Sequence, residues 1–152
     1  MKKIIALGIG SFFLWSCANH SDKKPTDQQE TENHAEHHHD ENAKAIELNN
    51  GERWIVNEEM KPFALKGSEL VNTYIQNNQT GYKELASQLK EQNDQLIKSC
   101  TMKGKSHEEL HKWLYPHLEL VKKLGQASND NEATTIIHQL EISYREYQNY
   151  FQ

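Results

Sequence analysis

The sequence is poor in cysteine and has no long apolar run in its main part. It contains two cysteines, Cys17 and Cys100, in 152 residues. Beyond residue 16, no stretch approaches the roughly 18 consecutive apolar residues of a transmembrane helix. The sequence also lacks a Cys-x-x-Cys-His motif, a glycine-rich phosphate loop and the chain order of a Ser, His and Asp catalytic triad. These absences argue against a disulfide scaffold, a c-type cytochrome and a nucleotide-binding or triad enzyme, and we predict that the protein is not an enzyme.

Basic residues are in the minority. The chain has 17 lysines and arginines against 22 acidic residues, a formal net charge of −5 with neutral histidines. Loss of Lys2 and Lys3 with a signal peptide would take this charge to −7. Because an acidic chain is repelled by phosphates, we expect no nucleic-acid partner, and cations are the natural small partners.

The first 17 residues have the order of features of a bacterial export signal. Two lysines begin it, residues 4–15 are apolar, and Ser16 precedes Cys17. This order resembles the lipobox of bacterial lipoproteins, which implies cleavage after a signal peptide at residues 1–16 and acylation of Cys17. The chain would then be anchored to a membrane by lipid without spanning it. Ala18 favours, by the same resemblance, the outer membrane of the cell envelope; a non-lipidated signal or an uncleaved anchor is the alternative.

Residues 17–45 are polar, charged and almost free of large apolar side chains. Such a segment cannot bury enough surface to fold, so we predict that the lipidated cysteine is followed by a disordered tether. The tether contains a histidine-rich tract with three carboxylates among its imidazoles. Its histidines are His34, His37, His38 and His39. Tracts of this kind bind zinc, nickel or copper loosely, so we interpret this one as a low-affinity metal tract, with a plain solvated spacer as the alternative.

The remaining residues, 46–152, are enough for one domain with a modest core. They begin with a short alternation around Asn50-Gly51, which predicts a small hairpin or an extended arm that packs Trp54 and Val56 onto the domain. From residue 57 onward, apolar side chains recur with the helical period in four blocks. Because the loops between the blocks are short, we predict an all-α domain, an antiparallel up-down-up-down four-helix bundle.

Five residues are candidates for capping three of the helices. Asn57 precedes the first block, and Asn129 with Glu132 precedes the fourth. Ser106 and Glu109 have the spacing of a capping box for the third helix, which we expect to begin near residue 107 after a tight turn at Gly104.

The turn between the second and third helices carries soft donors. If Cys17 is acylated, Cys100 is the only thiol of the folded part, and a lone thiol in an oxidising compartment needs burial or a ligand role. Met102 follows it, and His107 and His111 share one helix face because they are four residues apart. A thiol, a thioether and two imidazoles suit Cu(I), whereas zinc would use the cysteine and histidines but not the thioether. We therefore predict a metal site, with copper favoured over zinc.

Further along the third helix, His117 is a candidate fifth ligand or a partly buried histidine. A haem pocket of the b type could use Met60 or Met102 with His117 or His138, but nothing in the sequence favours haem. The opposing interpretation is that the turn packs without any ion. The domain would then be a non-catalytic structural or interaction module that presents one face to an envelope protein partner.

From about residue 48 onward the chain resembles small, uncharacterised helical-bundle envelope lipoproteins of Gram-negative bacteria. The resemblance is densest in residues 50–54 (NGERW), 57–62 (NEEMKP) and 100–104 (CTMKG), followed by His107 and His111. It implies a shared fold and a shared site, but no activity. The combined prediction is a lipid-anchored envelope protein that binds or buffers a soft metal ion.

Overall fold

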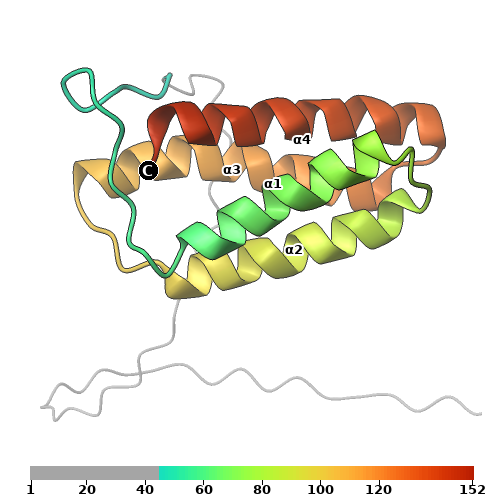
Figure 1. The fold of residues 1–152 in the computed structure, drawn as a ribbon, viewed down its shortest axis with the longest axis horizontal. Helices are drawn as coiled ribbons and strands as arrows, with labels where there is room; N and C mark the ends of the chain where they lie inside the picture. Colours follow the sequence, from blue (N-terminus) through green and yellow to red (C-terminus); the bar gives the residue numbers. More distant parts are fainter. Residues whose placement is uncertain (1–44) are drawn as a thin grey trace, which may run out of the picture. The chain divides into compact units, whose positions relative to one another are not determined.

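The four apolar blocks form four helices in the computed structural model, which describes residues 45–152 (Figure 1). The helices are α1 (Lys61–Gln76), α2 (Tyr82–Ser99), α3 (Lys105–Gln126) and α4 (Asp130–Tyr150). Each helix packs against the next along the chain, and α4 closes the bundle on α1. The predicted all-α four-helix bundle is therefore confirmed. Among residues 45–152, no helix combines the length and the hydropathy that crossing a membrane requires.

One apolar core runs through the bundle, and it contains a cluster of aromatic rings. Trp113 on α3 is enclosed, its ring lies 4.8 Å from that of Tyr147 on α4, and its Nε1 donates to the carbonyl of Ser143 at 2.8 Å. Tyr144 also reaches across to α1, where Gly67 leaves room for it. A Cβ on Gly67 would clash with the Tyr144 hydroxyl, so the close approach of α1 and α4 requires glycine there.

Residues 45–57 form an extended arm in front of α1. Residues 49–52 close a two-residue turn with Asn50 at φ 54° and Gly51 at φ 92°, as the Asn-Gly pair predicts. Further along, the backbone of Trp54 pairs with the C-terminal residues 150–152, and Val56 is buried. The predicted arm is therefore present, and the C-terminus holds it by hydrogen bonds.

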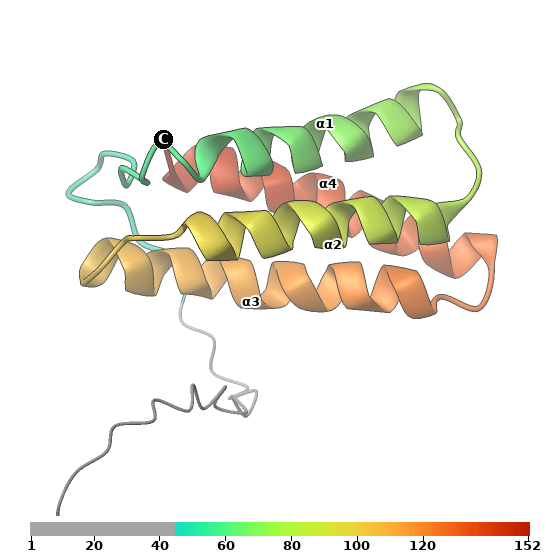
Figure 2. The same ribbon diagram turned by 90° about the horizontal axis from the view of Figure 1, so that it is seen from below.

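The arm, the C-terminus and the α2–α3 loop lie at the same end of the bundle, as the two views agree (Figures 1 and 2). The beginnings of α1 and α3 and the ends of α2 and α4 are at this end. Segments far apart in the sequence therefore meet around the α2–α3 turn.

The caps agree with the sequence at one helix and differ at two. Asn129 caps α4, since its side chain accepts from the N–H of Glu132 at 3.0 Å, and the Glu132 carboxylate accepts from the N–H of Ser128 at 2.9 Å. The expected cap at Asn57 is wrong, because α1 begins four residues later after Met60. The expected capping box of α3 is also wrong: no side chain caps the helix, whose boundary residue is Gly104.

Candidate metal centre

The predicted soft donors line one pocket at the end of the bundle that holds the arm. The pocket has a volume of about 210 Å³ and lies between the end of α2, the α2–α3 loop and the first turns of α3. Its donors are Cys100, Met102, His107 and His111. The structure thus places around one hollow the residues that the sequence places on two sides of a turn.

The floor of this pocket is apolar, and its rim carries the sulfur and imidazole side chains. Leu96, Leu110 and Leu114 line it and are buried, while the four donors are half-buried. Cys100 is a free thiol that is neither sealed in the core nor fully exposed. An ion in this pocket would have the donors on one side and a dry wall on the other, an arrangement that limits water access.

Asn57 fixes the backbone on both sides of Cys100. Its Nδ2 donates to the carbonyl of Ser99 at 2.9 Å, and its Oδ1 accepts from the N–H of Thr101 at 3.2 Å. The side chain that resembles a helix cap in the sequence therefore joins the arm to the loop that holds the thiol. This contact spans more than forty residues, and no local pattern indicates it.

Gly104 lets the chain turn from the thiol to the imidazoles. Its φ of 67° with ψ of −151° is a conformation that essentially only glycine adopts without strain. Its carbonyl accepts from the N–H groups of His107 and Glu108 at 3.1 Å each, which starts α3. His107 consequently lies in the first turn of α3, and His111 lies one turn later on the same face.

The two histidines continue into a row of rings along α3. The ring centroids of His107 and His111 are 4.2 Å apart, and those of His111 and Tyr115 are 4.8 Å apart. The Tyr115 hydroxyl lies 2.8 Å from Nδ1 of His111. In the tautomer in which Nδ1 donates to Tyr115, the ring presents its lone pair at Nε2. A second partner of this type commonly orients a metal-binding histidine.

The donors surround the pocket without forming a finished coordination sphere. Within residues 45–152, no three side chains of His, Cys, Asp or Glu converge closely enough to hold one metal ion. Methionine is not among those four residue types. An ion in this pocket would therefore need thioether ligands, a change in side-chain rotamers, or both.

His117 is not part of this pocket. It is fully buried on α3, with Nδ1 3.0 Å from the hydroxyl of Ser143, and it stacks on Trp113 with ring centroids 4.7 Å apart. Burial disfavours the charged ring and lowers the pKa of His117 to about 3. The sequence left open a ligand role or a partly buried position; the structure encloses the ring completely and separates it from the other four donors.

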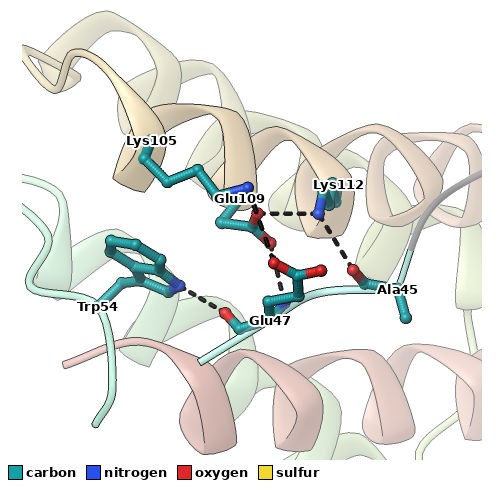
Figure 3. Close-up of polar contacts among 6 residues, drawn as sticks. All are labelled: Ala45, Glu47, Trp54, Lys105, Glu109 and Lys112. Carbon is teal, nitrogen blue, oxygen red and sulfur yellow. Dashed lines mark hydrogen bonds and ion pairs between the residues drawn. The ribbon is translucent and has the colours of Figure 1, made fainter. Parts of the chain in front are cut away.

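A second polar cluster lies on another face of the first turns of α3 (Figure 3). The carboxylate of Glu109 is fully buried, and its Oε1 lies 2.7 Å from Nζ of Lys105 and 2.8 Å from Nζ of Lys112. Its Oε2 accepts from the backbone N–H of Glu47 at 2.9 Å. Burial opposes ionisation here, but these hydrogen bonds outweigh it and hold the pKa of Glu109 at about 2.

This cluster explains the failed capping box and fastens the arm. Lys112 also donates to the carbonyl of Ala45 at 3.1 Å, and Trp54 donates from Nε1 to the carbonyl of Glu47 (Figure 3). Glu109 thus binds a partner 62 residues away instead of the end of its own helix. The cluster is a structural clamp between the arm and α3.

Cys17 and the tract histidines (His34, His37, His38 and His39) lie outside the described residues. The chain has no match among protein-family profiles, curated proteins or solved structures.

Proposed function

We propose that this protein is a lipid-anchored envelope protein whose bundle binds or buffers a soft metal ion, copper in the first place, at the pocket between α2 and α3. The observation that carries the proposal is the lining of that pocket by Cys100, Met102, His107 and His111. Thiolate, thioether and imidazole are ligands that suit Cu(I); zinc, the second choice, would use the cysteine and the histidines.

The proposed anchor rests on the first 17 residues of the sequence. Acylation of Cys17 would hold the bundle near the membrane, and the histidine-rich tract would act as a weak collector of ions in front of it. The role is binding and not catalysis. A fatty-acid label incorporated on expression in a Gram-negative host and lost in Cys17→Ala would support the anchor, whereas equal labelling of both chains would contradict it.

The metal proposal is tested by Cu(I) titration of the full chain in detergent under anaerobic, reducing conditions. To isolate the pocket, the starting protein carries Cys17→Ser and has the four tract histidines changed to serine. We expect one tight equivalent of Cu(I) in this protein and its loss in a Cys100→Ala/His107→Ala variant. Since binding to the thiolate displaces its proton, uptake should also release a proton.

His138→Ala is the matched control, because His138 is an exposed histidine on α4, away from the pocket. It should bind Cu(I) as the starting protein does. Equal affinity in the Cys100→Ala/His107→Ala variant would reject the metal proposal and leave the interaction module as the better interpretation.

A further inference from the structure

Met60 lines the same pocket as Cys100 and Met102, although it comes from another part of the chain. It is the boundary residue of α1, and its side chain is completely enclosed by protein. Its carbonyl accepts from the N–H groups of Phe63 and Ala64, which fixes its backbone at the start of the helix. The pocket therefore has sulfur on two sides, one side formed by the α2–α3 loop and the other by the beginning of α1.

Met60 is enclosed and also lies in the wall of the pocket. No solvent reaches its side chain, so its thioether would meet an ion in the hollow of about 210 Å³ through a change of side-chain rotamer, which the flexible methionine side chain allows. Leu110, Leu114 and Leu96 already provide an apolar floor there. What Met60 adds to that floor is a thioether, which a leucine would not provide.

The chemistry of three sulfurs restricts the ion. Thioethers bind soft monovalent ions such as Cu(I) and Ag(I) and contribute little to zinc, which takes thiolate, imidazole and carboxylate. Residues 45–152 bring no three side chains of those last types close enough to share an ion. Only two thiolate or imidazole ligands are needed in a site made of Cys100, one imidazole and the thioethers of Met60 and Met102.

We infer that Met60 is a metal ligand of this pocket, and that with Met102, the Cys100 thiolate and His107 it selects a monovalent soft cation over Zn²⁺. The inference rests on the proposed function, because it names the ligand set and the class of ion for the same pocket. The Cys100 thiol gives up its proton to solvent on binding, and no oxidation or reduction is involved.

The test compares Met60→Leu with the starting protein used for the Cu(I) titration. Affinities for Cu(I), Ag(I) and Zn²⁺ are measured by competition with chelators of known affinity. We expect Met60→Leu to weaken Cu(I) and Ag(I) by on the order of tenfold or more, because even partners outside the ligand sphere are worth about 10–100-fold. Zn²⁺ affinity should not change. Since Leu and Met are similar in volume, denaturant unfolding of the apo variant should report an intact fold.

X-ray absorption gives a readout that packing alone would not affect. In selenomethionine-labelled Met102→Leu protein loaded with Cu(I), copper should show a selenium neighbour. In Met60→Leu/Met102→Leu, which keeps only Met1, that neighbour should be lost.

Unchanged Cu(I) affinity in Met60→Leu, or no selenium neighbour in Met102→Leu, would overturn the role of Met60. In either case the loss of binding in Cys100→Ala/His107→Ala would still support the proposed function. If the starting protein takes up no Cu(I), the proposed function and the inference both fail.

Discussion

Four polar side chains of α3 form two groups that differ in how completely the protein surrounds them. Glu109 and His117 are fully buried, and each is fixed by hydrogen bonds to other segments. His107 and His111 are half-buried and face a pocket with an apolar floor. Buried polar groups of the first kind determine how the chain folds, whereas half-buried donors beside a hollow can still change partners. Substitutions in the first group should therefore alter stability, and those in the second should alter ion binding.

The largest effect should be a loss of stability at low pH, caused by the buried ring of His117. The pKa of His117 falls from 6.5 to about 3 because burial penalises the charged ring. Between these values the unfolded chain binds a proton that the folded chain does not, so stability is lost as the pH falls. The free energy of unfolding should decrease by about 1.4 kcal/mol per pH unit below pH 6.5, and by roughly 5 kcal/mol in all by pH 3. Urea titrations at a series of pH values measure this change in the free energy of unfolding.

Two variants test whether titration of the buried His117 ring causes this pH dependence. His117→Phe keeps an aromatic ring but cannot titrate, so its stability should stay nearly constant between pH 6.5 and 4.5. Ser143→Ala removes the hydrogen-bond partner and leaves the burial, so it should keep the wild-type slope. A wild-type slope in His117→Phe would show that another group is responsible.

The second effect concerns the buried carboxylate. The pKa of Glu109 lies at about 2, well below its ordinary 4.5. Because the folded pKa is depressed, this stabilisation is fully present above pH 4.5 and is lost as the pH falls through 2. Glu109→Gln should therefore lower the free energy of unfolding at pH 7 by about 3 kcal/mol. Its Cu(I) affinity should stay within about twofold of wild type, a small difference on the free-energy scale. A large fall in affinity would contradict the separation of the two groups.

The third effect links folding and the pocket. Asn57→Ala removes the two hydrogen bonds to the backbone on either side of Cys100. We expect a loss of about 1–2 kcal/mol in the free energy of unfolding, since each bond contributes about 1 kcal/mol. Because the thiol is then less firmly positioned, Cu(I) affinity should also fall. Glu59→Ala, which removes only an exposed partner of Asn57, is the control and should retain the wild-type affinity.

The fold could be predicted from the sequence because its signals are local. The helical period places four blocks, and the Asn129 and Glu132 cap and the Asn50-Gly51 turn occur as expected. The two caps that failed have the right residue types, but their side chains are used elsewhere. Asn57 holds the loop at Cys100, and Glu109 holds the backbone of Glu47. Such competition between a local and a distant partner is not visible in a linear pattern.

The candidate site could be predicted only where its residues are neighbours in sequence. Cys100, Met102, His107 and His111 lie within a dozen positions, so a tight turn was sufficient to bring them to one pocket. Met60 reaches that pocket from α1, and its separation in the sequence gives no indication of this. Conversely, His117 is close in sequence but lies on a different part of the helix surface, against α4.

The smallest effect tests whether burial, and not a short contact distance, gives the Glu109 ion pairs their contribution to stability. Lys90 and Asp94 on α2 form an ion pair at 2.6 Å, as short as the contacts of Glu109 with its lysines, but both side chains are more than half exposed. Water screens such a pair, so Lys90→Ala should change the free energy of unfolding by less than about 0.5 kcal/mol. Denaturant unfolding beside Glu109→Gln makes the comparison direct. If both variants lose similar stability, the enclosure of Glu109 is not what makes it important, and the division of α3 into buried and open groups loses its physical basis.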